Sequence, residues 1–350
     1  MTNLRKPLLA AALAFTFSTS AFTPFRAFAG SEAPFRVDST WKLGGAGSWD
    51  YLAVDAPEHL LYIARLNRIM VVDTQTGKLS GEIGGLQHAH GIAFNNQSNL
   101  GYISDGGAGT VIVFDRTTRN TIATIPVGKN PDAILFEPTR RLVFVFNGAS
   151  NNANVIDTST NKVIATLPMP GKPEFAVTDG AGNIFVNIED TSQVLRIDAA
   201  TLKAINSWSL APCAAPSGLA IDIVHHRLFS VCDNEKMAVV DSTSGKLVAT
   251  PAIGAGSDAV AYDPKHGLIF SSNGESGTLT ILLQTTPDRY QTLQTLPTME
   301  GARTLALDPS NDNVYTVTAK LGPKPMATKA NPKARPGIVP DTFVILVVRR

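Results

Sequence analysis

Short apolar runs alternate with polar turns along this chain, and the alternation recurs with a regular period. In each period, one apolar strand leads through a tight turn to a second, and a polar turn then leads to a third. The second strands are the clearest markers, and they occupy residues 61–64, 101–104, 142–145, 184–187, 228–231, 268–271 and 314–317. The pattern therefore predicts seven copies of one antiparallel β-unit.

An aspartate that closes the third strand measures the length of the repeat. It recurs as Asp73, Asp115, Asp157, Asp198 and Asp241, with successive spacings of 42, 42, 41 and 43 residues. A period of about 40–45 residues with several short strands is typical of one blade of a β-propeller. The sequence therefore predicts an all-β fold, a seven-bladed β-propeller. Asp and Thr in the following turns bond back to nearby amides, so turn formation explains them.

The two ends of the chain are expected to share one blade. The seventh repeat has a third strand at residues 343–348 and no fourth strand after it. A spare strand pattern lies near the other end, at residues 35–43. We therefore expect this N-terminal strand to complete the last blade and close the ring, because closure removes exposed strand edges.

Residues 1–29 have the pattern of a signal peptide. A basic start precedes an apolar run at residues 8–22, and residues 27–29 (Ala-Phe-Ala) supply small residues for cleavage. The run is short for a bilayer span, although an uncleaved membrane anchor is the alternative. We expect cleavage after Ala29, export to the periplasm, and a single propeller domain at residues 30–350 with no transmembrane segment.

The net charge argues against one class of partner. The chain has 30 Lys and Arg residues and 29 Asp and Glu residues, and removal of residues 1–29 takes away three basic residues and no acid. The remaining net charge is 27 − 29 = −2. A nearly neutral protein has no bulk electrostatic attraction for nucleic acid or for anionic membranes. We therefore expect no nucleic-acid binding.

Cys213 and Cys232 are the only cysteines, and they lie on either side of the first two strands of one repeat. An antiparallel pair brings the residues before its first strand close to the end of its second strand. The spacing is therefore compatible with a disulfide across one blade, which export would permit. The alternative is two free thiols, and the absence of a Cys-x-x-Cys-His motif excludes covalent haem attachment.

An insertion at residues 320–340 interrupts the seventh repeat between its second and third strands. It contains five prolines and no acidic residue, so we expect a Pro-rich flap or lid rather than a packed element. Loops of this kind belong to the same face as the residues that lead into the first strands. The basic residues of the insertion, which are candidate contacts for a partner, are Lys320, Lys324, Lys329, Lys333 and Arg335.

The chain resembles the YVTN-type, YncE-like seven-bladed propellers over essentially all of its length after the signal peptide. The resemblance rests on the Tyr- or Phe-bearing second strands, on the Val-Ile-Asp-x-x-Thr-x-Lys-Val-Ile-Ala-Thr phrase at residues 155–166, and on Gly-x-x-Pro-Asp at residues 128–132. It implies an exported or cell-surface propeller, mostly without an assigned reaction. The blades also look like those of propeller lactonases, lyases and subunits of periplasmic dehydrogenases, but no catalytic motif of those enzymes matches this chain.

Residues that lead into the first strands are expected to converge around the central axis at one face, where propellers usually bind ligands. Carboxylates dominate these positions, although the fourth repeat is one residue short and Glu174 is therefore a displaced candidate. Such a group can bind a cation or carry out acid–base chemistry, and the alternative is a polar, water-filled channel. The candidate ligand-binding residues are Asp50, His88, His90, Asp132, Glu174, Asp258 and Arg303.

His88 and His90 are two residues apart, which places both side chains on one face of a strand. The sequence shows no clear third ligand, so we predict no metal site and no cofactor. We expect a binding or assembly module that uses the acidic mouth and the basic insertion, rather than an enzyme. Its partner is an unidentified protein or small molecule.

Two other functions are compatible with the same residues. One is a lactonase-like hydrolase or lyase that uses Asp50, His90, Asp132 and Arg303 at the mouth. The other is an accessory subunit of a periplasmic redox enzyme, with the cofactor on its partner. The sequence alone does not decide between these and the binding module.

Overall fold

The computed structural model describes residues 1–2, 34–323, 325–326 and 336–350. The chain divides into a unit Met1–Ala33, of which only the first two residues are described, and a unit Pro34–Arg350 that contains every strand. The predicted signal peptide thus lies almost entirely outside the described residues. Within the described ranges, no helix is long and apolar enough to cross a membrane.

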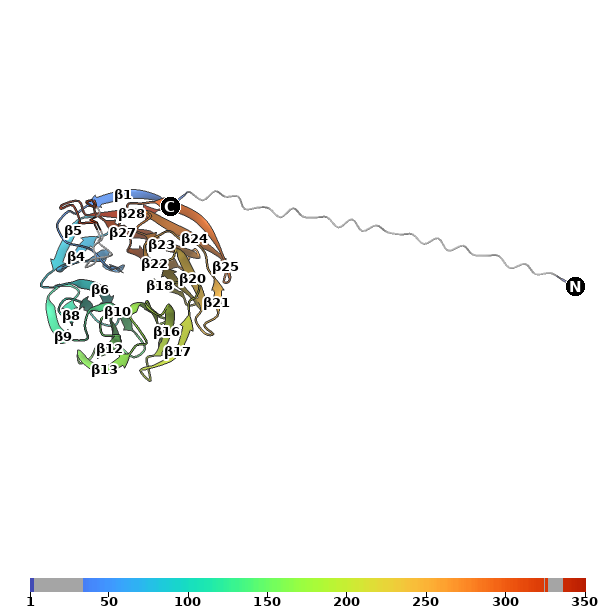
Figure 1. Cartoon of the computed structure of the whole chain (residues 1–350), viewed down its shortest axis with the longest axis horizontal. Helices are drawn as coiled ribbons and strands as arrows, with labels where there is room; N and C mark the ends of the chain where they lie inside the picture. Colours follow the sequence, from blue (N-terminus) through green and yellow to red (C-terminus); the bar gives the residue numbers. More distant parts are fainter. Residues whose placement is uncertain (3–33, 324, 327–335) are drawn as a thin grey trace. The chain divides into compact units, whose positions relative to one another are not determined.

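Seven four-stranded antiparallel sheets surround a central axis, as Figure 1 shows. Each sheet is one blade, and its strands follow one another from the axis outwards. This arrangement confirms the prediction of an all-β, seven-bladed β-propeller. The repeat length predicts it because each blade is built from hairpins between neighbouring strands of the sequence.

The strands of the first four blades, listed from the axis outwards within each blade, are β2 (Leu52–Asp55), β3 (Leu60–Arg65), β4 (Arg68–Asp73) and β5 (Leu79–Ile83); β6 (Ala89–Phe94), β7 (Leu100–Asp105), β8 (Thr110–Asp115) and β9 (Thr121–Pro126); β10 (Pro131–Glu137), β11 (Leu142–Asn147), β12 (Asn152–Asp157) and β13 (Lys162–Pro168); β14 (Pro173–Thr178), β15 (Asn183–Ile188), β16 (Gln193–Asp198) and β17 (Lys203–Ser209). Those of the last three are β18 (Pro216–Asp222), β19 (Arg227–Cys232), β20 (Lys236–Asp241) and β21 (Leu247–Ala249); β22 (Ser257–Asp263), β23 (Leu268–Asn273), β24 (Thr278–Thr286) and β25 (Arg289–Pro297); β26 (Leu305–Asp308), β27 (Asn313–Thr318), β28 (Val344–Arg349) and β1 (Arg36–Lys42).

The N-terminal strand closes the ring as predicted. Strand β1 pairs antiparallel with β28, in a register that runs from Arg36 opposite Arg349 to Lys42 opposite Val344. Just before β1, the backbone N–H of Phe35 donates to Oε1 of Gln294 at 2.9 Å. Nε2 of Gln294 donates back to the Phe35 carbonyl at 2.8 Å. The first described residues of the ring are therefore tied to blade six as well as to blade seven.

The core lies between the blades rather than inside a single sheet. The second and third strands of each blade are mostly buried, whereas the outermost strands are mostly exposed. Each apolar cluster joins neighbouring blades, as in the packing of β11 against β15 through Phe144 and Val186. A strand with neighbours on both faces needs apolar side chains on both, which explains the near-continuous apolar runs in the sequence.

The aspartates that close the third strands stabilise the turns that follow them, so turn formation accounts for these residues. Oδ1 of Asp73 accepts hydrogen bonds from the backbone of Gln75 at 2.9 Å and of Thr76 at 2.8 Å. These hydrogen bonds, with that from Thr76 first, hold the pKa of Asp73 below its ordinary value. The same arrangement recurs at Asp115, Asp198 and Asp241.

The predicted disulfide is present. Cys213 and Cys232 are bonded in blade five, with 5.7 Å between their Cα atoms. Cys232 ends β19 opposite Pro216, which begins β18, so the bond joins the chain before the first strand to the end of the second. This is the geometry that the antiparallel pairing implies.

Only the two ends of the insertion in blade seven are described. Leu321 and Ile338 form an antiparallel bridge, and both pack against the apolar cluster between blades one and seven. The Gly322 N–H donates to the Gly337 carbonyl at 2.7 Å. Lys320 is exposed at the base of this pair. The other four candidate contacts lie outside the described residues; they are Lys324, Lys329, Lys333 and Arg335.

Candidate functional site

The first strands of neighbouring blades contact one another around the whole ring, in the order β2, β6, β10, β14, β18, β22 and β26. Residues at the same end of these strands therefore face one axis, although up to 253 positions separate them in sequence. We call six of these residues the mouth cluster. They are Asp50, His90, Asp132, Glu174, Asp258 and Arg303.

His90 lies between two carboxylates that come from the blades on either side of it. Its Nδ1 donates a hydrogen bond to Oδ2 of Asp50 and lies 3.7 Å from Oδ1 of Asp132. All three side chains are at most 18% exposed. Blades one, two and three thus place an Asp-His-Asp group in a largely water-excluded position.

Arg303 extends this group around the other side of the mouth. One of its guanidinium nitrogens pairs with Oδ2 of Asp258. The other donates to the Trp49 carbonyl at 2.7 Å and lies 3.5 Å from Oδ1 of Asp50. Ser217 of blade five donates to Oδ1 of Asp258 at 2.6 Å. A chain of polar contacts therefore runs through six successive blades, from Ser217 to Asp132.

The fourth blade contributes a separate charged group. Nζ of Lys172 pairs with both Glu174 and Glu189. Although the fourth repeat is one residue short, Glu174 still belongs to the mouth, since the charge of Asp132 acts on its pKa. The predicted displacement of Glu174 therefore does not remove it from the site.

His88 also lies beside this group but differs from His90. Its ring centroid is 4.4 Å from that of His90, and its side chain is exposed. Burial of part of the ring and then the charge of His90 lower its pKa. The structure thus brings all seven candidate ligand residues to one place, but His88 stands at the rim rather than inside the polar chain.

Burial and crowding change the acidity of the mouth carboxylates. Burial, and then the charge of Asp50, raise the pKa of Asp132 to about 6. Burial, and then the charge of Asp132, raise the pKa of Glu174 to about 9 despite the Lys172 ammonium. Burial opposes ionisation of Asp50 too, but the hydrogen bond from His90 and the Arg303 charge outweigh it and lower the pKa. The mouth therefore has more acidic groups than its fixed cations neutralise.

The mouth favours the charged form of His90, although it disfavours the charged forms of Asp132 and Glu174. Burial lowers the pKa of its imidazole, but the hydrogen bond to Asp50 and the charge of Asp132 outweigh burial and raise it. The imidazolium form is thus favoured by two carboxylates at once. His90 lies between the two carboxylates of blades one and three and links them.

Tyr51 is a mouth residue that sequence reasoning missed. Burial, and then the charges of the four mouth carboxylates, raise the pKa of its phenol well above the ordinary value. Its ring meets that of Phe175 edge to face, with 5.2 Å between centroids. Tyr51 and Phe175 directly follow Asp50 and Glu174 in the sequence, so their positions in the repeat could have indicated that they lie at the mouth. Sequence reasoning also missed other contributors, namely Lys172, Glu189 and Ser217.

Phe175 also lines a cavity beside the first strands. This cavity, of about 360 Å³, lies against blades two, three and four. Its other large apolar lining residues are Ile92, Phe94, Ile134, Leu135 and Phe136. The side chains of Asn96 and Thr178 line it too, so its wall is partly polar and partly apolar.

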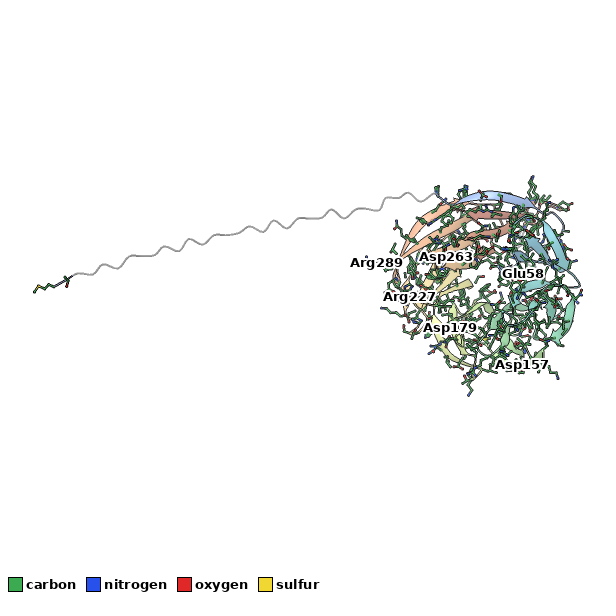
Figure 2. The ribbon with its side chains drawn as sticks, turned by 180° about the vertical axis from the view of Figure 1, so that it is seen from behind. Glu58, Asp157, Asp179, Arg227, Asp263 and Arg289 are labelled. Carbon is green, nitrogen blue, oxygen red and sulfur yellow. A yellow bond between two sulfur atoms is a disulfide. The ribbon has the colours of Figure 1, made fainter. Side chains whose placement is uncertain are left out.

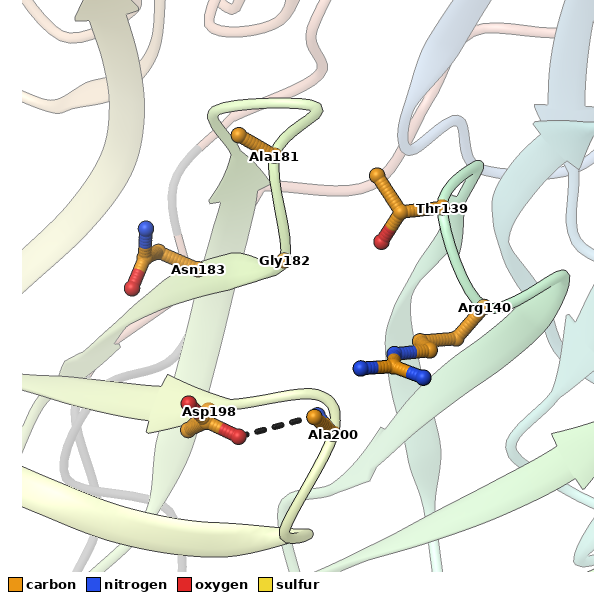
Figure 3. A pocket seen from close by; sticks show the side chains of 7 residues that line it. All are labelled: Thr139, Arg140, Ala181, Gly182, Asn183, Asp198 and Ala200. Carbon is orange, nitrogen blue, oxygen red and sulfur yellow. Dashed lines mark hydrogen bonds between the residues drawn. The ribbon is translucent and has the colours of Figure 1, made fainter.

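A second cavity, of about 400 Å³, lies between the turns of blades three and four and is separate from the mouth (Figure 3). The Asp198 carboxylate accepts the Ala200 N–H at 2.9 Å, so it serves its own turn. Arg140 is exposed beside it. This cavity does not gather several buried polar groups, so the mouth is the stronger candidate site. Its lining residues are Thr139, Arg140, Ala181, Gly182, Asn183, Asp198 and Ala200.

Comparison with known proteins supports the fold. No family model matches the chain, and no curated protein matches it. Among solved structures, a chain of Kuenenia stuttgartiensis hydrazine synthase is similar, with a TM-score of 0.66 and 17% identity over 83% of this chain and 95% of that one. The WD40 repeats of RRP9 are similar with a TM-score of 0.73 and 11% identity, over 88% of this chain and 96% of that one. The structure of U3-55K has a TM-score of 0.72 and 11% identity, over 87% of this chain and 97% of that one.

These identities are low, so the comparisons establish the propeller fold and nothing about ligands. The resemblance to YVTN-type, YncE-like propellers stays a prediction from the sequence, because no family model matches the chain. Function has to be argued from the mouth itself.

Proposed function

We propose that this protein is an exported β-propeller that binds a positively charged ligand group at the mouth of its central channel. The observation that carries the proposal is the surplus of buried carboxyl groups there. Asp132 and Glu174 have pKa values of about 6 and about 9, which means that each resists ionisation in the mouth. A cation placed beside them would favour the ionised forms and would therefore bind preferentially.

The fixed cations of the mouth argue against an anionic ligand. Each of the three already has carboxylate partners: His90 has Asp50 and Asp132, and Arg303 has Asp258 and Asp50. Lys172 is likewise shared by two glutamates. An anion would have to displace one of these partners, whereas a cation adds to a site that is already too acidic.

A binding or assembly role also fits the surroundings of the mouth. The insertion of blade seven begins at Lys320, on the loop that follows a second strand, and such loops lie on the mouth face. We propose that its basic residues contact an acidic part of the same partner. The disulfide between Cys213 and Cys232 supports export, because such bonds persist in oxidising compartments.

A hydrolase or lyase is the second candidate, and one observation favours it. The hydrogen bond between His90 and Asp50 is the kind that orients an imidazole for general base catalysis. The other nitrogen of that ring, Nε2, would have to reach a substrate. It is buried, and a Cβ atom at Gly106 would lie only 2.6 Å from it. The reactive nitrogen thus faces the protein rather than the mouth, so binding is the better-supported function.

The experiment compares cationic and anionic probes. Isothermal titration would measure the affinity of spermidine, and of Lys-rich and Glu-rich peptides of equal length, for the wild type and for a double variant with Asp132→Asn and Glu174→Gln. The control is Glu58→Gln, which removes one carboxylate from an exposed turn (labelled in Figure 2). We expect the cationic probes to bind the wild type and the control equally, and the double variant at least tenfold more weakly. Equal affinity for all three proteins, or binding of the anionic peptide alone, would refute the proposal.

A further inference from the structure

We propose that the mouth binds a divalent metal ion through Asp50, His90 and Asp132. This inference rests on the proposed function, because it names the class of cation that the mouth takes. The sequence suggested His88 as the neighbour of His90 in a metal pair and supplied no third ligand. The structure instead provides two carboxylates, from the blades on either side of His90.

The three side chains already present one ligand atom each to a common point. One carboxylate oxygen from each aspartate and one imidazole nitrogen lie within 4.8 Å of one another. The His90 Nδ1 lies 3.7 Å from Oδ1 of Asp132 and donates to Oδ2 of Asp50. Metal–ligand bonds of about 2.0–2.2 Å require ligand atoms roughly 3 Å apart. Asp50 and His90 would therefore have to move slightly apart, and the carboxylate of Asp132 would have to move slightly towards them.

The burial of His90 is an independent observation that points to a ligand. The residue is only 8% exposed, yet its Nε2 has no hydrogen-bond partner among the described residues. Burying a polar nitrogen without a partner costs about 1–3 kcal/mol, so such a ring position calls for a compensating interaction. Coordination at Nδ1 would fix the ring hydrogen on Nε2, so that Nε2 becomes a defined donor for an acceptor in the surrounding protein or for water.

The space beside Nε2 suits a ring bound to a metal through Nδ1. Gly106 lies next to it, and a Cβ atom there would be 2.6 Å from Nε2 and 2.8 Å from Oδ1 of Asn130. In metal sites the second ring nitrogen usually donates to an oxygen of the surrounding protein or to water. Oδ1 of Asn130 lies near Nε2, because the same Cβ position at Gly106 would contact both atoms, and the missing side chain of Gly106 leaves room for the ring to turn.

The surroundings of Asp50 also leave its ligand oxygen available. Arg303 lies 3.5 Å from Oδ1 and is otherwise bound to Asp258 and to the Trp49 carbonyl. Oδ2 is the oxygen that faces His90. Arg303 therefore orients the carboxylate from outside without occupying the oxygen that the metal would take, which is the role of an outer-shell group.

The ligand set indicates which metals would bind. One imidazole nitrogen and two carboxylates suit Zn²⁺ or Mn²⁺, whereas Ca²⁺ and Mg²⁺ prefer oxygen ligands alone. Three protein ligands leave at least one position for water or for a ligand group. Binding is balanced by release of one proton, because the metal replaces the hydrogen shared by Nδ1 of His90 and Oδ2 of Asp50, and that proton leaves to solvent.

The opposite ends of the strands provide a matched control. Asp263, His266 and Asp312 also place three ligand atoms within 4.8 Å of one another, at a turn whose Asp263 is labelled in Figure 2. There, however, His266 is exposed and Lys265 already occupies the Asp312 carboxylate, with 2.7 Å between them. The two groups share residue types and differ in burial and competing charge, so only the mouth group is expected to retain an ion.

The test uses the purified protein after treatment with EDTA and removal of the chelator. Titration with ZnCl₂ or MnCl₂, followed by gel filtration and elemental analysis, would give stoichiometry and affinity for wild type, His90→Ala and His266→Ala. We expect one ion per chain in the wild type and in His266→Ala, and at least 100-fold weaker binding in His90→Ala. CaCl₂ should compete poorly. If His90→Ala does not fold, Asp132→Asn serves instead, since it retains the shape of the side chain.

Each outcome decides the question. No stoichiometric ion in the wild type, or an ion retained in both mouth variants, overturns the inference. Loss of the ion in His266→Ala alone would move the site to the opposite face and overturn it as well. If spermidine or the Lys-rich peptide binds the mouth while no metal does, the proposed function stands and the metal inference fails. If neither organic cations nor metals bind, both fail.

Discussion

The ring of Tyr51 meets the ring of Phe175 edge to face across the channel, with 5.2 Å between their centroids. The two residues belong to blades one and four, which lie on opposite sides of the seven-membered ring. The Tyr51 side chain therefore reaches across the channel, where the charges of the mouth carboxylates act on its phenol. Its partner Phe175 also helps to line the cavity beside the first strands.

Truncation of the Tyr51 side chain should open the channel and destabilise the folded protein. We expect Tyr51→Ala to lower the free energy of unfolding by about 2 kcal/mol, because it removes a half-buried ring and its contact with Phe175. Tyr51→Phe should change it by less than about 1 kcal/mol, since the ring contact remains. Urea unfolding at neutral pH measures both. Equal losses in the two variants would show that the hydroxyl, rather than the ring contact, matters.

Because the pKa of Asp132 is raised, we expect ionisation of this residue to lower the free energy of unfolding at neutral pH. Its pKa is about 6 in the folded protein, above the ordinary value of 3.8, so ionisation disfavours the folded state. Stability contributed by the protonated form is complete below about pH 4 and is lost as the pH rises to about 6. Asp132→Asn should therefore be more stable than the wild type by about 3 kcal/mol at pH 7.5 and equal to it at pH 3.5.

Unfolding curves at several pH values test this difference. Glu58→Gln is the control, because it changes an exposed carboxylate in a turn far from the mouth in the repeat. Its curve should follow that of the wild type. An Asp132→Asn protein that is less stable at pH 7.5 would mean that the Asp132 charge supports the fold through His90.

The buried side chain of Arg65 is expected to make a large contribution to stability. The side chain is fully buried, stacks 3.6 Å above the Phe343 ring, and has its pKa lowered to about 10 by burial and then by Arg68. We expect Arg65→Leu to cost about 3 kcal/mol, since it leaves partly buried carbonyl groups without donors. The carbonyls that Arg65 binds belong to Gly45, Ala46, Gly47 and Ser48.

Thermal unfolding of Arg65→Leu and Arg65→Lys separates shape from charge. The Lys variant keeps the charge but loses the planar stacking and several donors, so it should recover only part of the stability. Arg140→Leu, in an exposed turn, should leave the midpoint unchanged. Full recovery by Lys would contradict the argument from the stacked guanidinium.

The disulfide is expected to affect both the thiol content and the free energy of unfolding of the protein. The unreduced protein should show no free thiol, because Cys213 and Cys232 are the only cysteines and they are bonded. Changing both to Ser should lower the free energy of unfolding by about 3 kcal/mol, as expected for a closed loop of about 20 residues. Both sulfurs are buried, so mild reductant should act only once the protein unfolds. Alkylation by iodoacetamide before and after denaturation checks this.

The blade count could be predicted from the sequence because each blade is local. Its strands pair with their sequence neighbours, so the spacing from Asp73 to Asp115 to Asp157 measures the same unit each time. The closing strand could also be predicted, since residues 343–348 lack a fourth strand that residues 35–43 supply. The disulfide followed from the same pairing rule. In each case a hydrogen-bond ladder between adjacent strands determines the geometry.

The sequence by itself thus determined the seven blades, the closure and the set of residues that lead into the first strands. The tertiary structure alone decided how those side chains pair: His90 with Asp50 and Asp132 rather than with His88, and Tyr51 against Phe175. The physical reason is that each side chain chooses its rotamer according to what other blades place across the axis. Those partners come from distant repeats, and no local pattern encodes them.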